Sequence, residues 1–131
     1  MKTVTIEIQG PPTPQPRPRF RRMGKFVSTY DPLSKQKEKL RKEVISVQYN
    51  DVPISSPIKC FVYFYMPIPK SVKSGESDAH VKRPDIDNLI KYTWDLLAGI
   101  VYEDDKQIYY VEAIKLYAKR PRTSITFKYE E

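Results

Sequence analysis

The stretch KRPDIDNLIKYTWDLL, residues Lys82–Leu97, carries the strongest local folding signal in this 131-residue chain. Wound at about 100° per residue, it gathers most of its apolar side chains, with one threonine, on one arc. The members of that arc are Leu89, Ile90, Thr93, Trp94, Leu96 and Leu97. The pattern predicts an amphipathic helix from about Asp87 to Ala98, ended by Gly99, with its apolar face packed on a sheet.

Strand signals surround this helix. VTIEIQ (4–9) alternates apolar and polar residues and predicts a strand with one buried face. PIKCFVYFYMPI (57–68) is apolar on both faces, which is typical of a central strand. QIYYVEAIKLYA (107–118) and TSITFKY (123–129) predict two further strands joined as a hairpin across KRPR.

The remaining segments complete the predicted fold. GPPTPQPRPRFRR (10–22) predicts an extended loop, because its prolines forbid a helix interior. A second helix is expected in residues 31–48, with Asp31 as N-cap and Pro32 at the first helical position. We expect its apolar stripe to contain Leu33, Leu40, Val44 and Val47.

PKSVKSGESDAHVK (69–82) lacks periodicity and predicts a surface loop in which His80 is solvated. Together, two helices and at least four strands indicate an α/β or α+β fold with a mixed sheet packed with the helices. We expect residues 1–131 to form a single domain.

Composition limits the class of protein. A net charge of +7 and a pI near 9.4 favour a polyanionic partner, of which nucleic acid is the commonest. No apolar run is long enough to cross a bilayer, so no membrane partner is expected. Cys60 is the sole cysteine and no export signal is evident, which together predict a cytoplasmic protein without disulfides.

Five aspartates nevertheless lie within 21 residues of this basic chain: Asp85, Asp87, Asp95, Asp104 and Asp105. Each one alone is compatible with a helix cap, an ion pair or a polar turn. Together they repel one another unless they are protonated, spread apart or neutralised by a cation. Carboxylates without nearby His or Cys select Mg²⁺ or Mn²⁺ rather than zinc, so the cluster predicts a metal site within a DNA-binding surface.

Spacing adds detail to this site. Asp87, Lys91 and Asp95 fall on the polar face of the predicted helix. Asp85 and Asp87 are two residues apart in what we expect to be extended backbone, so both side chains can reach the same space. Lys91 is placed to stabilise the extra negative charge of a phosphodiester transition state or to orient a water.

The motif RPDIDNLIKYTWDLL, followed by YEDDKQI and a strand ending near Lys115, resembles the RusA family of Holliday-junction resolvases. These crossover junction endodeoxyribonucleases are common in prophages. GPPTPQPRPRF is similar to the Gly-Pro and Arg-Pro-Arg loop of the family, although Gln15 stands where relatives often have a lysine. The resemblance implies a Mg²⁺-dependent homodimer that resolves four-way junctions by paired nicks in DNA recombination and repair, and Mn²⁺ is expected to substitute.

The resemblance also implies roles for individual residues. Asp85, Asp87 and Asp105 match the catalytic metal-binding carboxylates, and Lys91 matches the essential lysine. Asp104 is expected to be an auxiliary metal ligand. The candidate DNA contacts are all basic: Arg17, Arg19, Arg21, Arg22, Lys35, Lys39, Lys42, Lys82 and Arg83. The Tyr-rich strand QIYYVEAIKLY is a candidate dimer interface.

Three alternatives compete with this interpretation. Pro84-Asp85 with Asp104-Asp105-Lys106 can be fitted to the PD-(D/E)xK pattern of restriction-like nucleases, which requires the two halves on adjacent strands. A non-catalytic protein that binds branched DNA would use its acids only for caps and ion pairs. A protein-interaction module would use the basic helix around residues 35–42.

Overall fold

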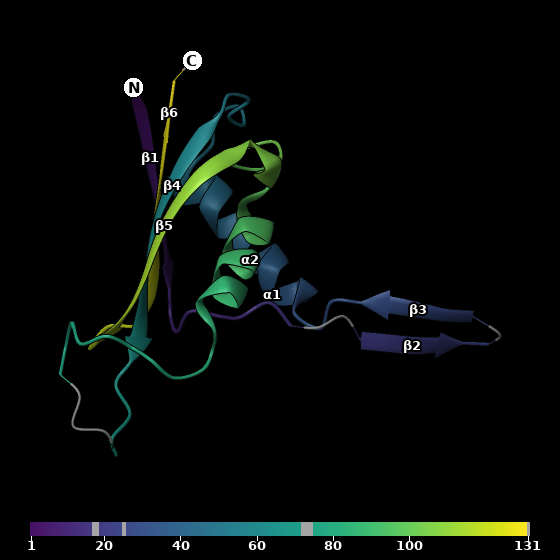
Figure 1. Ribbon diagram of the computed structural model, residues 1–131. Coiled ribbons are helices and arrows are strands. Elements are labelled where there is room, and N and C mark those ends of the chain that lie inside the picture. The colour runs from purple at the N-terminus through teal and green to yellow at the C-terminus, as the bar shows by residue number, and fades with distance from the viewer. Residues whose placement is uncertain (17–18, 25, 72–74, 131) are drawn as a thin grey trace.

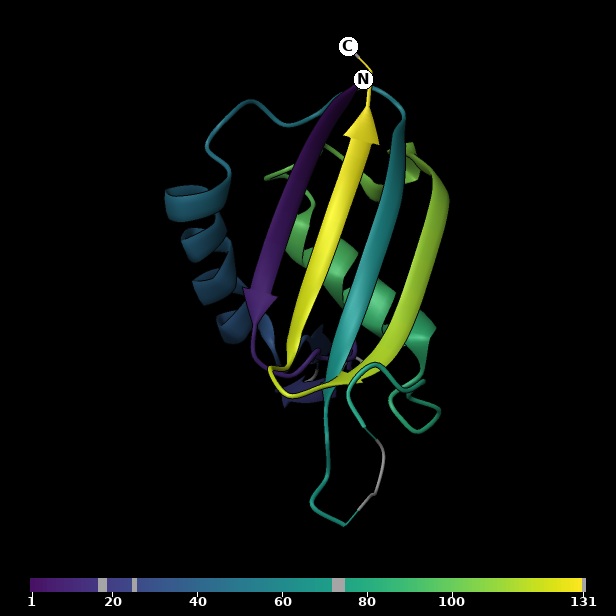
Figure 2. The same cartoon turned by 90° about the vertical axis from the view of Figure 1, so that its left-hand side faces the viewer.

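The computed structural model describes most of the chain: residues 1–16, 19–24, 26–71 and 75–130. Its main sheet contains four strands: β1 (Lys2–Gln9), β4 (Ile58–Pro67), β5 (Ile108–Ala118) and β6 (Arg122–Tyr129). β6 is antiparallel to its neighbours β1 and β4, whereas β4 and β5 are parallel, so the sheet is mixed. The α-helices lie on one face of this sheet (Figure 2). The predicted α+β fold with a mixed sheet is therefore confirmed.

The strand order differs from the expected hairpin between the last two strands. β5 and β6 are consecutive in the sequence, yet β4 lies between them in the sheet. The helical connection from β4 to β5 makes these two strands parallel, and β6 then pairs with the other edge of β4. The hairpin prediction was therefore wrong. β4 is central, as predicted, and buries alternate residues from Ile58 to Met66.

The helix predicted from the apolar periodicity is α2 (Ile86–Leu97), which begins one residue earlier than expected. Its buried leucines join a core that includes Ile6, Phe64 and Phe127 of the sheet. The chain leaves the helix through Gly99, whose φ of +83° favours glycine. In the described ranges, no helix combines the length and the apolar character needed to cross a bilayer.

The first helix, α1 (Ser34–Glu43), begins two residues later than predicted. Asp31 does not cap it, because the Asp31 carboxylate accepts the backbone N–H of Leu33 at 2.8 Å and closes a turn ahead of the helix. The Asp31 carbonyl then accepts the N–H of Ser34 at 3.2 Å. An aspartate before a proline thus marked the approach to the helix rather than its first residue.

After α1 the chain passes into a π-helical turn, η1 (Val44–Gln48). The N–H of Tyr49 donates to the carbonyl of Val44 at 2.8 Å across this wider turn. The turn changes the direction of the side chains that follow. Val44 is buried as predicted, but Val47 is 82% exposed and lies outside the predicted apolar stripe.

The proline- and arginine-rich segment is only partly the loop that was expected. Its last four residues belong to a short strand, β2 (Arg19–Met23), which pairs antiparallel with a second short strand, β3 (Phe26–Tyr30). They form a sheet separate from the main one, and Figure 1 shows this hairpin projecting from the body of the molecule. Its sequence lacks the alternation of a strand with one buried face, so periodicity did not reveal it.

The segment before α2 also differs from expectation. His80 is buried rather than solvated, and its ring packs against the ring of Tyr117 with centroids 4.8 Å apart. The backbone N–H groups of Ser77 and His80 donate to the carbonyls of Tyr117 and Lys115 at 2.8 and 3.0 Å. Residues 77–80 therefore lie along the outer edge of β5 at its carboxyl end.

Candidate active site

The amino-terminal end of α2 presents one pair of carboxylates. Asp85 occupies the N-cap position in extended conformation, with φ −68° and ψ 143°, but its side chain makes no capping hydrogen bond. Asp87 follows in the first turn, and both side chains are exposed. Ile86 between them packs against the core. Asp87 lies in the helix rather than in the extended backbone that the sequence analysis expected, yet both acids reach the same surface.

This pair lies in a surface hollow with mainly cationic polar neighbours. Lys82, Arg83 and Lys115 line it together with Asp85 and Asp87. The Lys115 ammonium donates to the backbone carbonyls of Lys82 and Pro84 at 2.6 and 2.7 Å. Lys115 therefore holds the segment that leads into Asp85.

Lys91 is exposed on the polar face of α2, as the helical wheel predicted. The ordinary structural role for it would be an i,i+4 ion pair with Asp87. Among the salt bridges of the described residues, none joins Lys91 to Asp87. Both charged groups are therefore available to a ligand.

Asp95, by contrast, is bound to the protein itself. Its Oδ2 lies 2.7 Å from Nζ of Lys37, a residue that is only 1% exposed. The same ammonium donates to Gln15 Oε1 at 2.9 Å and to the Asp31 carboxylate. The negative charge of Asp95 is thus compensated by a buried lysine, which gives this residue a structural role.

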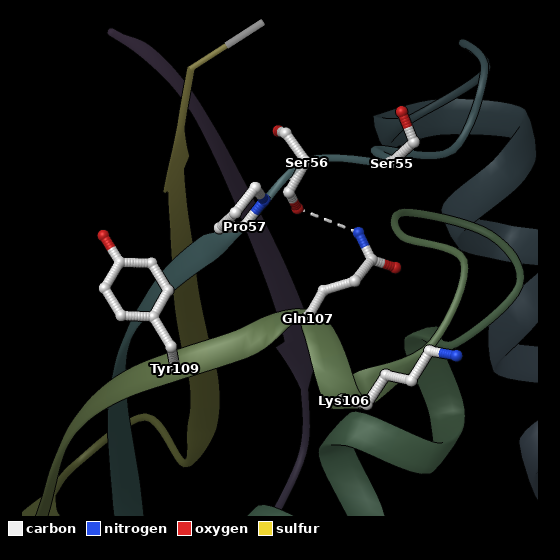
Figure 3. A pocket seen from close by; sticks show the side chains of 6 residues that line it. All are labelled: Ser55, Ser56, Pro57, Lys106, Gln107 and Tyr109. Atoms are coloured by element: carbon white, nitrogen blue, oxygen red, sulfur yellow. Dashed lines mark hydrogen bonds between the residues drawn. The ribbon is translucent and has the colours of Figure 1, made fainter.

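The second pair of carboxylates lies in the turn before β5. Asp104 precedes a short 3₁₀ helix, η2 (Asp105–Gln107), and accepts the N–H of Lys106 at 2.9 Å. Gln107 accepts the N–H of Asp104 at 2.7 Å and donates to the carbonyls of Ile54 and Ser56 at 2.8 and 3.0 Å. Figure 3 shows the Gln107 side chain reaching the Ser56 carbonyl. This glutamine fixes the orientation of the acidic turn.

The two carboxyl groups of this turn have opposite pKa shifts. The N–H of Lys106 lowers the pKa of Asp104 by stabilising its charged form. Partial burial, followed by the nearby charges of Asp104 and Asp95, raises the pKa of Asp105. Negative charge is therefore concentrated at this turn, and a cation would relieve it.

The two pairs lie at opposite ends of α2. A helix of 12 residues is about 18 Å long, and Asp85 precedes its first turn. Asp104 and Asp105 lie beyond its other end, where Asp95 influences the pKa of Asp105. In the described part of the chain, no three His, Cys, Asp or Glu side chains are close enough together to hold a metal ion. One chain thus forms each predicted pair but does not bring the two pairs together.

A model of the family described as Endodeoxyribonuclease RusA matches residues 9–128. The chain belongs to the RusA family. It is also 26% identical over 138 residues to the uncharacterized protein YqaN of Bacillus subtilis (strain 168), an alignment that covers 98% of this chain and 97% of that protein. The resemblance to RusA is therefore confirmed, and with it the class of endodeoxyribonuclease associated with Holliday-junction resolution.

The RusA fold also excludes the restriction-like alternative. That interpretation requires the Pro84-Asp85 half and the Asp104–Lys106 half on adjacent strands. In the structure Asp85 is the N-cap of α2, and Asp104–Lys106 form a turn and a 3₁₀ helix ahead of β5. Neither half lies in a strand.

The predicted DNA contacts fall in three places on this RusA chain. Arg17 lies outside the described residues, and the side chains of Arg19 and Arg21 are likewise not described. Arg22, in β2, is exposed. The other candidates are exposed on α1 or beside Asp85: Lys35, Lys39, Lys42, Lys82 and Arg83.

Sequence reasoning missed three residues that position the acids: Lys37, Gln107 and Lys115. Lys115 had a weak signal, because it is the one cation in a strand that is otherwise apolar and tyrosine-rich except for Glu112. Lys37 had none, since it lies among other lysines in a helix that reads as a basic, solvated face. Gln107 would have required knowledge of the Ile54 and Ser56 carbonyls to which it donates.

Proposed function

We propose that this RusA-family protein is a Mg²⁺-dependent endonuclease that resolves four-way DNA junctions by paired nicks in recombination and repair. The observation that carries the proposal is the exposed pair Asp85 and Asp87 in a hollow lined by Lys82, Arg83 and Lys115. Two acids of this kind oppose phosphate binding unless a cation lies between them and the DNA.

The donor set suits such a cation. Mg²⁺ in proteins is commonly held by one or two carboxylates, with water and substrate phosphates completing its shell. Asp85 and Asp87 would hold it, and Asp104 and Asp105 are the further candidates. When bound, a divalent cation neutralises phosphate charge and makes water more acidic, and Mn²⁺ offers the same chemistry.

The other residues of the hollow have complementary roles. Lys82 and Arg83 attract the phosphate backbone toward the acidic pair, and Lys115 holds the segment that carries them. Lys91 lies one helical turn beyond Asp87 with no ion pair to that acid, so its ammonium is available for the extra negative charge of the transition state. In this proposal the carboxylates hold the cation, and the positively charged side chains hold the substrate.

Paired nicks in opposed strands require two centres related by symmetry. A homodimer supplies them, and its two-fold axis matches the symmetry of a four-way junction. The Tyr-rich strand β5, at the edge of the main sheet, supports this arrangement because it leaves apolar side chains exposed.

The test is cleavage of a labelled four-way junction and its matched linear duplex with Mg²⁺, with Mn²⁺ and with EDTA. We expect symmetric nicks in the junction with either metal, ligatable products, and no cleavage with EDTA. Junction binding without cleavage under every metal condition would favour the non-catalytic DNA-binding alternative. Equal cleavage of the duplex would contradict junction resolution.

A further inference from the structure

The main sheet has one face that the described chain leaves uncovered. The α-helices lie on the opposite face, and Figure 2 views the sheet from the uncovered side. Residues of a strand alternate between the two faces, so the side chains that lie between the buried residues of β4 reach this surface. We call this surface the free face. β4 gives it three aromatic residues: Phe61, Tyr63 and Tyr65.

The aromatic rings of the free face contact one another. Tyr63 and Tyr65 are stacked, with ring centroids 5.9 Å apart and an angle of 11° between their planes. The ring of Phe61 lies 5.8 Å from that of Tyr110 on β5. Tyr63 is 41% exposed although β4 is a central strand. The rings thus form an aromatic band along β4, and a contiguous exposed patch of this kind is typical of a binding surface.

A pair of lysines lies at one end of the aromatic band. Lys59 of β4 and Lys128 of β6 are register partners, so their charges lie side by side. Like charges directly opposite each other destabilise a sheet. No salt bridge among the described residues includes either lysine. Their ammonium groups lie 5.5 Å and 5.0 Å from the ring centroids of Tyr110 and Phe61. An anion bound between the two lysines would relieve their repulsion.

A third cation lies at the other end of the aromatic band. Arg122 of β6 is the register partner of Tyr65, and its guanidinium carbon lies 3.9 Å from the centroid of that ring. The strand from Lys59 to Tyr65 is about 20 Å long. Both ends of the aromatic band therefore carry positive charge.

The acids of the free face lie at its sides. A carboxylate oxygen of Glu7 on β1 lies 3.9 Å from Nε of Arg122, and Glu112 on β5 accepts the hydroxyl of Tyr110 at 2.6 Å. Both acids belong to edge strands, whereas the three cations belong to the central strands β4 and β6. The middle of the free face is therefore both aromatic and positively charged.

We propose that the free face binds single-stranded DNA, with unstacked bases on the aromatic band and phosphates at Lys59, Lys128 and Arg122. Every base has a flat π-face, so stacking on aromatic rings holds single strands of any sequence, while cations hold the backbone. The length of the band suits a short site, near the lower end of the range of about 4–16 nucleotides. This site is separate from the junction site proposed above and does not rest on it.

Other occupants fit the free face less well. In duplex DNA the faces of the bases are stacked on one another, so the rings would gain no contact. A protein partner would have to remove water from Lys59 and Lys128, which have no acid beside them in the described chain. DNA is the single-stranded nucleic acid that suits this chain, because its family is one of endodeoxyribonucleases.

The free face is also separate from the acidic pair. Asp85 and Asp87 belong to the start of α2, which lies on the opposite side of the sheet. A strand bound on the free face therefore leaves these acids accessible. The protein should hold a single strand and a junction at the same time.

The first test measures the anisotropy of a labelled oligothymidine in EDTA, so that no cleavage interferes. Tyr63→Thr removes a ring but keeps a residue that favours strands, and affinity should fall about five- to a hundredfold, the effect of losing one stacked base. Tyr63→Phe keeps the ring and should bind within about twofold of wild type. Circular dichroism confirms that both variants fold. Equal affinity of the two variants would overturn the proposal.

Two further oligonucleotides test the class of ligand. The matched duplex should bind at least about tenfold more weakly than the single strand to the free face, a difference that Tyr63→Thr should abolish. If wild type bound duplex and single strand equally, stacking would be excluded. A preference of about tenfold for oligouridine would overturn the assignment to DNA.

The phosphate contacts are tested through salt dependence. Lys128→Gln removes one exposed cation of the free face, so the slope of log K against log salt concentration should fall in magnitude by about 0.7. The control is Lys70→Gln, an exposed lysine in the loop after β4, which should leave the slope unchanged. Equal slopes for wild type and Lys128→Gln would remove this lysine from the site.

Photocrosslinking locates the bound strand directly. An oligonucleotide that contains 4-thiothymidine should crosslink to the β4 peptide that includes Tyr63, as mass spectrometry of the digest will report. Excess unlabelled four-way junction in EDTA should leave this crosslink in place. Crosslinks confined to α1 or to the hollow around Asp85, or loss of the β4 crosslink with junction, would overturn a separate site.

A last comparison separates this site from the proposed function. Tyr63→Thr should bind a four-way junction in EDTA within about twofold of wild type and should keep the same mass in light scattering. A lower mass would mean that a second copy covers the free face, and would overturn the proposal. A wild-type protein that cleaves no junction with any divalent metal would refute the proposed function, but the oligothymidine measurements would still decide the free face.

Discussion

The ammonium of Lys37 lies 2.7 Å from the carboxylate of Asp95 although the two residues belong to different helices. Lys37 also binds Gln15, which precedes the β2–β3 hairpin, and Asp31, which follows it. One buried cation therefore joins both ends of the hairpin to the helix that carries Asp87 and Lys91. The position of the hairpin relative to the candidate active site depends on this contact.

Removing this cation should destabilise the fold. Lys37→Met leaves Asp31 without its lysine and Asp95 with only Arg41, at 3.8 Å. Because both carboxylates are partly exposed, we expect a loss of about 2–3 kcal/mol in the free energy of unfolding, below the usual cost at fully buried pairs. Urea denaturation measures it. The control, Lys35→Met, changes an exposed lysine of the same helix and should cost less than about 0.5 kcal/mol. Equal stability of the two variants would contradict a structural role for Lys37.

The same contact should appear in the acid limb of stability. The hydrogen bond from Lys37 holds the pKa of Asp31 below its ordinary value of 3.8. A lowered pKa in the folded state stabilises the protein above about pH 4, and that contribution is lost as the pH falls through the folded value. Asp31→Asn should therefore lower the melting temperature at pH 7 and flatten its decline below about pH 4. If the melting temperatures of the two proteins declined in parallel from about pH 7 to about pH 2.5, this role of Asp31 would be contradicted.

Asp87→Asn should separate cleavage from binding. Asparagine keeps the shape of the side chain but removes a charge and most of the affinity for Mg²⁺, so cleavage should collapse. Junction binding without metal should hold or tighten, because one source of repulsion from phosphates is gone. Both are measured on one preparation, with Glu38→Gln on α1 as the control for charge. Loss of binding in a folded Asp87→Asn protein would refute the metal-site assignment.

Lys91→Ala should affect chemistry far more than stability. If its ammonium stabilises transition-state charge, the single-turnover cleavage rate should fall by about a hundredfold. The free energy of unfolding should change by only a few tenths of a kcal/mol, since Lys91 has no ion pair with Asp87 in the described chain. Lys119→Ala, at another exposed lysine, should cleave normally. A near-normal rate for Lys91→Ala would remove this residue from the mechanism.

The double change Lys82→Ala with Arg83→Ala should weaken junction binding and reduce its dependence on salt. Each phosphate contact contributes about −0.9 to the slope of log K against log salt concentration, so the slope should fall in magnitude by roughly one to two. Fluorescence anisotropy at several salt concentrations measures this. If binding weakened equally at every salt concentration, with an unchanged slope, neither residue would contact phosphate.

Local pattern was sufficient for the two α-helices and the four strands of the main sheet, although not for the β2–β3 hairpin. The helical periodicity of the apolar residues in 86–97 identified α2. The same helical wheel placed Asp87, Lys91 and Asp95 on its exposed face. The sequence also placed Asp85 and Asp87 on one surface, although Asp87 lies in the first turn of α2 and not in the extended backbone that was expected. These features depend on neighbours in the chain, which the sequence states directly.

Tertiary structure alone decided which elements meet. The pattern of β6 identified it as a strand but not as the neighbour of β4, because pairing depends on the edge that the β4–α2–β5 connection leaves free. In the sequence, Lys37 resembles its solvated neighbours. In the structure, Asp31, Gln15 and Asp95 from other segments all accept hydrogen bonds from its ammonium. The two acidic pairs lie within 21 residues of sequence but are separated by the length of α2, because a helix turns sequence proximity into distance along its axis.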